Sequence, residues 1–507
     1  MDQPATHPEP LTVETLMNRS GVQFGTSGAR GEVVAMTDLV CYGYTQGFLK
    51  YLGEIGEFAG GRVALAGDLR PSTPRILAAC AQAIRDLGAE PVFCGYIPTP
   101  ALALYAFAQG IPSLMVTGSH IPDDRNGIKF YRPAGEVLKS DEAGMKRQPI
   151  TFDPAAFDGG DMLVAQTPLE VTADAATPYV ERYKAVFGAD ALAGLRIGIY
   201  QHSAVGRDIV LAIVAALGAD AVPIGRATRF IPVDTEAIRP EDVELAKRWA
   251  AEEGFDAIIS TDGDSDRPLL ADHTGEWLRG DVLGVLCARA IGAGTVVTPV
   301  SSNTVLERSG VFAHTMRTRI GSPFVIAAMN EALAAGQDKV CGYEANGGFL
   351  LASDIELNGQ PLSALPTRDA VLPVVAVIAA ARAGTASGRV RDLLGQLPPR
   401  VTCSDRIQEF PTQRSEAIFA LLLEGDEVAQ LAHLNCYFGA IAGTITGLDL
   451  TDGIRMTTAS GAILHLRRSG NAPELRCYSE TDDAETAAAI NAKALAVVKD
   501  QLAQVAA

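Results

Sequence analysis

The chain has 507 residues, 48% of them hydrophobic, and a formal net charge of −18 from 42 basic and 60 acidic side chains. This is the composition of an ordinary globular protein with several cores, which excludes the disordered and fibrous classes. At about 150 residues per domain, the length predicts three to four domains. The acidic excess argues against nucleic acid and anionic membranes as partners, because both present phosphates to a protein. A small basic pocket is still compatible with this charge.

Nothing in the sequence predicts export or a membrane span. The N-terminus has neither a basic segment nor an apolar segment of the secretory type. The longest apolar run, 370–381, is interrupted by Pro373 and is too short for a bilayer. The eight cysteines include no Cys-x-x-Cys pair, which is typical of buried thiols in a reducing compartment. We therefore expect a cytoplasmic protein.

Two segments, 61–95 and 194–225, share one plan. Each has a β-rich run, a polar loop, an apolar-periodic helix ending in Leu-Gly-Ala, and a second strand that ends at glycine. A shorter third copy spans 294–315. Strand–loop–helix–strand units imply parallel strands whose faces are covered by helices, so each copy predicts an α/β domain.

The character of the chain changes after residue 396. The segment Ala462–Leu466 is typical of a strand, and the Ala- and Lys-rich tail Asp483–Val505 is typical of a helix. This pattern predicts a separate α+β domain. The expected organisation is three related α/β domains and one α+β domain, with boundaries at 1–165, 166–279, 280–395 and 396–507.

The segment Asp262–Arg267, Asp-Gly-Asp-Ser-Asp-Arg, follows the strand-like run 255–260. Its three alternate carboxylates repel one another, and a divalent cation with a preference for hard oxygen ligands, such as Mg²⁺, removes that repulsion. An EF-hand is excluded, because Arg267 and His273 stand where its glycine and glutamate would be. The alternative is a solvated acidic turn, and we favour the metal site.

A serine in Thr117–Pro122, Thr-Gly-Ser-His-Ile-Pro, follows a short apolar run. Ser119 could be a nucleophile, a phosphate ligand or a plain turn residue, and the segment alone favours the turn. A hydrolase elbow needs glycine where Ile121 stands, so a conventional serine hydrolase is excluded. Lys129, a few residues later, could be a general base or a surface lysine.

Three further segments are rich in glycine or arginine. The segment Arg467–Arg476 has arginines on both sides of Ser-Gly-Asn, which suits a dianionic phosphate, although a hairpin with solvated charges has the same pattern. The loop Phe24–Gly31 carries one arginine, and the loop Cys341–Gly348 carries one carboxylate and one amide, as a reader of sugar hydroxyls would. Taken alone, each of these two loops is more typical of a turn.

In this order and spacing, the five segments resemble the α-D-phosphohexomutases, a family of phosphomannomutases, phosphoglucomutases and phosphoglucosamine mutases. The resemblance runs from about Phe24 to Glu480, nearly the whole chain. It implies four domains around a central cleft, with a small sugar phosphate as the ligand and with one Mg²⁺ per chain. We expect a monomer or a homodimer.

The resemblance also implies roles for individual residues. Ser119 falls at the phosphoserine position and is implied to be a metal ligand together with Asp262, Asp264 and Asp266. The positions associated with catalysis are Arg30, His120, Lys129 and Arg267, besides Ser119 itself. The implied substrate-binding residues are Glu344, Asn346, Arg319, Arg467, Ser469, Gly470, Asn471 and Arg476.

The implied reaction interconverts hexose 6-phosphate and hexose 1-phosphate through the phosphoserine and a hexose 1,6-bisphosphate, which also acts as activator. The chain departs from the common family pattern at Ile121, Gly348 and Ala472, all in elements of specificity. We predict a phosphomannomutase, with phosphoglucomutase or phosphoglucosamine mutase as alternatives. A non-catalytic sugar-bisphosphate-binding relative and a metal-dependent phosphatase are alternatives of other classes. The retained serine and aspartates argue against the non-catalytic one.

Overall fold

The structure, a computed structural model, describes residues 11–25, 28–468 and 473–505. The chain forms two compact units, one of residues 1–295 and 329–393 and the other of residues 296–328 and 394–507. It leaves the first unit within β12 (Thr295–Pro299), returns within α11 (Ser322–Ala334) and leaves again at the end of α13 (Val390–Leu394). Both units are therefore built from two separate stretches of chain.

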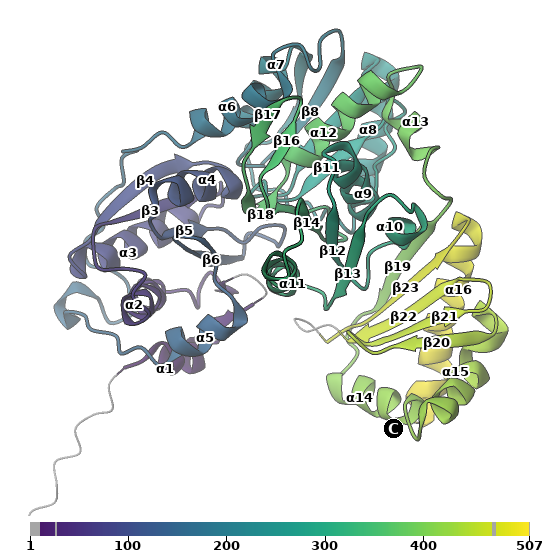
Figure 1. The fold of residues 1–507 in the computed structure, drawn as a ribbon. Helices are drawn as coiled ribbons and strands as arrows, with labels where there is room; N and C mark the ends of the chain where they lie inside the picture. The colour runs from purple at the N-terminus through teal and green to yellow at the C-terminus, as the bar shows by residue number, and fades with distance from the viewer. Residues whose placement is uncertain (1–10, 26–27, 469–472, 506–507) are drawn as a thin grey trace, which may run out of the picture. The chain divides into compact units, whose positions relative to one another are not determined.

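The first unit begins with a mixed seven-stranded sheet in the order β1-β2-β6-β5-β3-β4, with β7 paired to β6 (Figure 1). Strands β3, β4 and β5 run parallel, whereas β6 is antiparallel to its neighbours. Its strands are β1 (Gln23–Phe24), β2 (Ala29–Glu32), β3 (Arg62–Gly67), β4 (Glu90–Tyr96), β5 (Ser113–Val116), β6 (Arg125–Arg132) and β7 (Gly135–Glu136). The accompanying helices are α1 (Val13–Ser20), α2 (Asp38–Glu54), α3 (Thr73–Asp86), α4 (Thr99–Gln109), α5 (Lys139–Lys146) and the 3₁₀ turn Pro154–Ala156.

Helix α2 is the centre of the core of this sheet. It is buried along nearly all of its length, and Tyr44, Phe48 and Leu52 share one apolar cluster with Val63 and Leu65 of β3. Burial of such a continuous apolar surface, at about 25 cal/mol per Å², is the main force that fixes the sheet. The strand ends that carry polar loops are thereby held on a rigid layer.

A four-stranded sheet follows in the order β11-β10-β8-β9, in which only β10 and β11 pair antiparallel. Its strands are β8 (Arg196–His202), β9 (Asp220–Arg226), β10 (Ala257–Thr261) and β11 (Pro268–Ala271), and its helices are α6 (Ala176–Phe187), α7 (Arg207–Ala216) and α8 (Pro240–Glu253). The acidic segment 262–267 is the hairpin turn between β10 and β11.

The two predicted copies are confirmed as the units β3-α3-β4 and β8-α7-β9, each with parallel strands. The helix of each copy ends before a glycine with positive φ, Gly88 at 74° and Gly218 at 91°. Glycine adopts this left-handed conformation without strain, so it ends the helix and turns the chain back to the sheet. The shorter third copy is present as β12, α10 (Val305–Arg308) and β13 (His314–Thr318).

The rest of the first unit contains the antiparallel strands β14 (Val340–Tyr343), β15 (Phe349–Leu351) and β18 (Leu365–Asp369). The loop 344–348 is the hairpin turn between β14 and β15. The remaining elements of this part are α9 (Gly280–Ala290), α12 (Val371–Gly384) and the small hairpin of β16 (Ile355–Leu357) and β17 (Gln360–Leu362).

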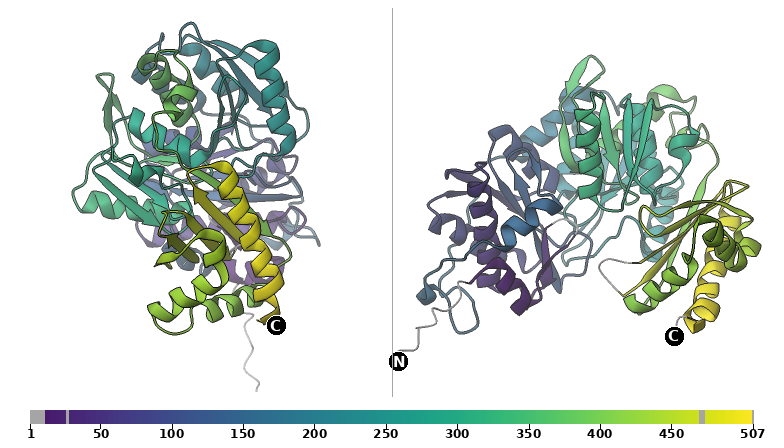
Figure 2. Two further views of the ribbon diagram at one scale, coloured as in Figure 1. Left: turned by 90° about the vertical axis from the view of Figure 1, so that its right-hand side faces the viewer. Right: turned by 60° about the horizontal axis from the view of Figure 1, so that its bottom comes forward.

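The second unit contains an antiparallel sheet in the order β19-β23-β22-β21-β20, with α16 lying along one face of it (Figures 1 and 2). Its strands are β19 (Val401–Ile407), β20 (Ile445–Asp449), β21 (Ile454–Thr458), β22 (Ile463–Arg468) and β23 (Leu475–Thr481). Its helices are α14 (Thr412–Leu422), α15 (Glu427–Ala442), α16 (Ala484–Val497), the π turn Val498–Leu502 and α17 (Ala503–Val505). The predicted strand, closing helix and α+β character are confirmed.

Within the described ranges, no helix combines the length and the apolarity that crossing a bilayer requires.

Candidate active site

Ser119 lies in the loop after β5 with a φ of 56°, in the left-handed region that a non-glycine residue rarely adopts. Its backbone N–H donates to Thr117 Oγ1 at 2.7 Å, and its hydroxyl donates to Asp262 Oδ2 at 2.6 Å. The side chain is fully buried. The structure therefore brings the predicted serine to the predicted metal turn, although 143 residues separate Ser119 from Asp262.

Arg70 fixes the conformation of the loop that carries Ser119. Its guanidinium donates to four backbone carbonyls of the loop, those of Ser119, Ile121, Pro122 and Arg125, at 2.5–2.9 Å. Its Nε donates to Asp68 at 3.0 Å, and its charge lies 4.1 Å from the ring centre of Phe230. A planar, permanently charged fork is well suited to hold several carbonyls at once.

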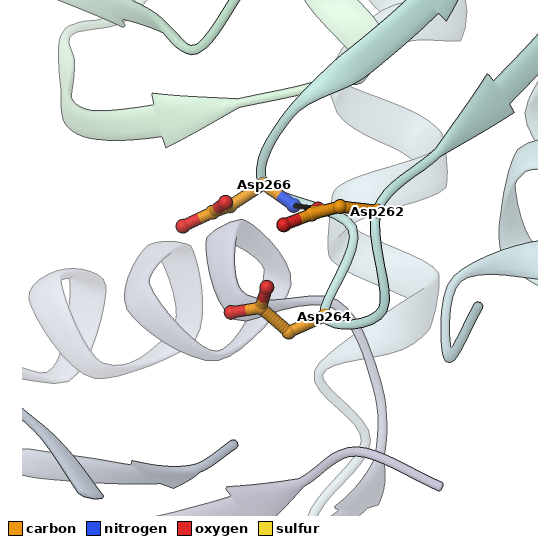
Figure 3. Close-up of side chains that lie close together, drawn as sticks. All are labelled: Asp262, Asp264 and Asp266. Atoms are coloured by element: carbon orange, nitrogen blue, oxygen red, sulfur yellow. Dashed lines mark hydrogen bonds between the residues drawn. The ribbon is translucent and has the colours of Figure 1, made fainter. Parts of the chain in front are cut away.

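The three aspartates lie together at the β10–β11 turn and are fully buried (Figure 3). One oxygen from each carboxylate lies within 4.8 Å of the other two. Asp264 Oδ1 and Asp266 Oδ1 accept no hydrogen bond from any part of the chain that the structure describes. Buried carboxylate oxygens without donors are costly, and a hard divalent cation satisfies them. The residues present therefore fit a metal ion.

Three cations compensate the acidic turn, Lys129 and Arg368 through hydrogen bonds and Arg267 through an ion pair with Asp266 Oδ1 at 3.7 Å. Lys129 Nζ of β6 donates to Asp264 Oδ2 at 2.6 Å and to Asp266 Oδ2 at 2.5 Å, and Arg368 Nε of β18 donates to Asp266 Oδ2 at 2.9 Å. Burial opposes ionisation of Asp266, but Arg368 and Lys129 outweigh it and hold the pKa well below the usual range. Burial and the two neighbouring carboxylates raise the pKa of Asp262 well above its usual value.

His120 pairs with Arg267 next to the serine. Arg267 Nη1 lies 2.9 Å from His120 Nδ1, and Ser119 Oγ lies 3.5 Å from the same nitrogen. A guanidinium can only donate, so Nδ1 is the acceptor and the ring proton is on Nε2. Burial, together with the charge of Arg267, lowers the pKa of His120 to about 3, so the imidazole is neutral near pH 7. His120 therefore orients Arg267.

Arg30 of β2 faces the same cluster of charges. Its guanidinium makes no hydrogen bond or ion pair within the described ranges, although both Asp264 and Asp266 act on it electrostatically. Burial and the nearby Arg267 lower its pKa to about 10, so it stays charged at neutral pH. An unpaired guanidinium at this place can receive an anionic ligand.

The loop 344–348 is connected to the acidic turn through Arg368. Arg368 Nη1 lies 3.4 Å from Glu344 Oε2, and the Asn346 side chain accepts the N–H of Gly348 at 2.9 Å. Thr235 donates to the carbonyl of Asn346 at 2.7 Å. The first unit thus brings Ser119 and the aspartates together with the three predicted catalytic cations and the imidazole of His120. Glu344 is connected to this cluster through Arg368.

The other predicted substrate-binding residues belong to the second unit. Arg467 and Arg476 are opposite each other on β22 and β23, and the tip of that hairpin, with Ser469, Gly470 and Asn471, lies outside the described residues. Asp452 accepts from Arg467 Nε at 3.0 Å and from the N–H of Ile320 at 2.8 Å. It thereby holds Arg467 next to the loop that carries Arg319.

The sequence reasoning missed Arg70 and Arg368. Arg70 had a usable signal, because it follows the first strand of a parallel β-α-β unit, where functional loops gather. Arg368 had none, since it lies within a strand with no motif around it.

The chain is similar to known proteins along nearly its whole length. The chain matches the three alpha/beta/alpha domains of the phosphoglucomutase/phosphomannomutase models, domain I at residues 21–148, domain II at 177–275 and domain III at 279–401. It is 45% identical to a phosphomannomutase of Sinorhizobium fredii, over 95% of this chain and all of that protein. It is 43% identical to a phosphomannomutase of Salmonella muenchen, over 96% and 98% of the two chains.

A solved phosphoglucomutase/phosphomannomutase family protein from Burkholderia thailandensis has the same fold, with a TM-score of 0.70 at 18% identity over 94% of this chain and 96% of that one. The matching domains and the phosphomannomutase relatives show an enzyme that transfers phosphate. The chain belongs to the phosphoglucomutase/phosphomannomutase family, the α-D-phosphohexomutases.

Proposed function

We propose that the protein interconverts mannose 6-phosphate and mannose 1-phosphate through a phosphoserine at Ser119. The proposal is supported by the two near full-length phosphomannomutase relatives. The observation that carries it is the 2.6 Å contact between Ser119 Oγ and Asp262 Oδ2 inside the acidic turn. A serine in that place can carry a phosphoryl group whose charge is compensated by the surrounding cations.

The proposed first step moves the phosphoryl group from phospho-Ser119 to a free hydroxyl of the sugar phosphate. The bond from phosphorus to Ser119 Oγ breaks, the bond to the sugar oxygen forms, and the hydroxyl proton passes by way of Lys129 to Ser119 Oγ. The resulting hexose 1,6-bisphosphate turns round and returns its other phosphoryl group to Ser119. Arg267, oriented by His120, and Arg30 stabilise the charge of the group in transfer.

Ser119, Asp262, Asp264 and Asp266 would hold one Mg²⁺, and their oxygen atoms are the ligand type that this ion prefers. When bound, the ion supplies electrostatic stabilisation of phosphoryl oxygens. Glu344 and Asn346 are proposed to read the sugar hydroxyls. The distal phosphate is assigned to Arg319, Arg467 and Arg476 together with the hairpin tip at 469–471.

The predicted four-domain division, with boundaries after residues 165, 279 and 395 and a central cleft, is part of this proposal. Free bisphosphate is expected to activate the enzyme by phosphorylating Ser119. The cytoplasmic location and the monomeric or homodimeric state stay predictions.

The decisive experiment is the Ser119→Ala variant, with intact-mass measurement of the purified wild type. We expect one additional phosphoryl mass on the wild type and none on the variant, and loss of interconversion in the variant. Ser113→Ala, a buried serine at the start of β5, is the matched control and should keep activity. Full activity of Ser119→Ala would refute the mechanism. Binding of bisphosphate without turnover, or release of phosphate faster than interconversion, would indicate the non-catalytic relative or the phosphatase.

The sugar is tested by kcat/KM for the 1-phosphates of mannose, glucose and glucosamine. We expect the highest value for mannose. A higher value for glucose or glucosamine would assign the phosphoglucomutase or phosphoglucosamine mutase activity instead.

A further inference from the structure

Arg368 connects two loops of the site that are distant in sequence. It extends from β18, is 2% exposed, and donates from Nε to Asp266 Oδ2 at 2.9 Å. Its Nη1 lies 3.4 Å from Glu344 Oε2. A single guanidinium thus bridges the acidic turn and the loop 344–348.

Gly348 leaves the space through which this arginine passes. A Cβ at Gly348 would lie 2.6 Å from Cδ and 2.9 Å from Cγ of Arg368. The backbone of Gly348 has no positive φ, so an alanine would be compatible with its conformation. Glycine is therefore needed at position 348 for steric reasons. A larger residue would collide with the aliphatic part of Arg368, which cannot move away because its guanidinium is bound to Asp266.

The bridge also determines which oxygen of Asp266 is available. Oδ2 already accepts from both Lys129 and Arg368, whereas Oδ1 accepts no hydrogen bond from the described chain. The planar fork of an arginine fixes the orientation of the carboxylate that it binds. Asp266 is thereby held with Oδ1 free of hydrogen bonds and 3.7 Å from Arg267 Nε.

We propose that Arg368 is a positioning residue that couples the sugar-reading loop to the metal site, and that Gly348 is glycine in order to admit it. The proposal rests on the proposed function and deepens it. Arg368 contacts Asp266 and thereby orients the Asp266 oxygen that accepts no hydrogen bond. It also contacts Glu344 and thereby determines how far Glu344 lies from the acidic turn. Partners of metal ligands in this relation typically contribute 10–100-fold to metal affinity.

The first test replaces the arginine and measures Mg²⁺ binding to the free protein by calorimetry. In Arg368→Met we expect the Kd for Mg²⁺ to rise about 10–100-fold. Arg368→Lys keeps the charge but cannot bridge both carboxylates, so it should restore much of the Mg²⁺ affinity and leave the KM for the sugar phosphate raised. Arg391→Met is the matched control, because Arg391 likewise contacts two carboxylates, Asp272 at 3.3 Å and Glu276 at 3.5 Å.

The second test uses Gly348→Ala, which removes no charge. As a single substitution it should displace Arg368 and weaken Mg²⁺ binding. Combined with Arg368→Met, it should cause no further loss of Mg²⁺ affinity. Melting curves of each variant establish that it is folded, and Gly348→Ala decides the question if Arg368→Met fails to fold.

An unchanged Mg²⁺ Kd in folded Arg368→Met or in Gly348→Ala would overturn the proposal, as would losses that simply add in the double variant. These results need no turnover, so they are separate from a failure of the proposed function, which would appear as a wild type that binds Mg²⁺ but does not interconvert sugar phosphates.

Discussion

Single residues at this site are held in states that they would not adopt alone. Ser119 has a left-handed backbone, which costs a non-glycine residue of the order of 1–3 kcal/mol unless its surroundings impose it. Thr117 accepts its N–H, and Arg70 binds its carbonyl. The hydroxyl is therefore held in one orientation. In the proposed mechanism Ser119 is the reacting group, and orientation of that group is one of the larger sources of rate enhancement.

The buried His202 gives a prediction for the pH dependence of stability. Burial lowers its pKa in the folded protein to about 4, whereas an unfolded histidine has a pKa near 6.5. The unfolded state therefore takes up the proton first, and the stability that His202 confers is present above pH 6.5 and lost as the pH falls towards 4. The loss approaches about 3 kcal/mol.

The measurement is the free energy of unfolding in urea at pH 7 and at pH 4.5. His202→Asn tolerates the positive φ of this position and does not titrate, so its stability should decrease less on acidification than that of the wild type. His314→Asn, at an exposed site on β13, should behave like the wild type. Equal pH dependence in all three proteins would contradict the prediction.

At the scale of elements, the site is a set of loops at strand ends, and this is the part that the sequence predicts. In the first unit these are the turn after β10 and the loop after β5, whose residues stand out in the sequence by their chemistry. Arg368 could not be found in this way, because its function arises from a contact with Asp266, 102 residues away, which no local pattern encodes. The pairing of His120 with Arg267 is hidden for the same reason.

The close approach of two of these loops gives a prediction at Gly263. A Cβ there would lie 2.5 Å from the carbonyl oxygen of Ser119, although the backbone of Gly263 has no positive φ. Gly263→Ala should therefore push the serine loop and the acidic turn apart and lower kcat about 10²-fold, the usual cost of a displacement near 1 Å. Gly159→Ala, with no atom near its Cβ, is the control. Wild-type kcat in a folded Gly263→Ala would show that the loops move independently.

At the scale of the whole molecule, all the predicted metal ligands and their cationic partners belong to the first unit. The predicted ligands come from two different sheets, Ser119 from the loop after β5 and the aspartates from the β10–β11 turn, so an ion bound there would connect these two sheets. Binding to the folded state alone stabilises by about 2.7 kcal/mol at 100 times Kd.

We therefore expect Mg²⁺ to raise the unfolding temperature of the first unit and to leave the second unit unchanged. Calorimetry combined with hydrogen exchange of peptides from each unit measures this, and chelation with EDTA should reverse it. Asp264→Asn should abolish the response. An equal shift of both units would locate the effect elsewhere.

The chain passes three times from one unit to the other, so the two stretches of the second unit are synthesised at different times. Residues 296–328 emerge from the ribosome well before their partners, since Asn303 binds Thr402 and Thr304 binds Glu480. At about 5–20 residues per second, residues 394–507 take on the order of ten seconds to make. During that interval the first unit can already fold, while the residues that Asn303 and Thr304 contact in 394–507 have not yet been made. A chain that ends late in the message would thus carry a segment 296–328 without these contacts, and proteases can recognise a segment exposed in this way.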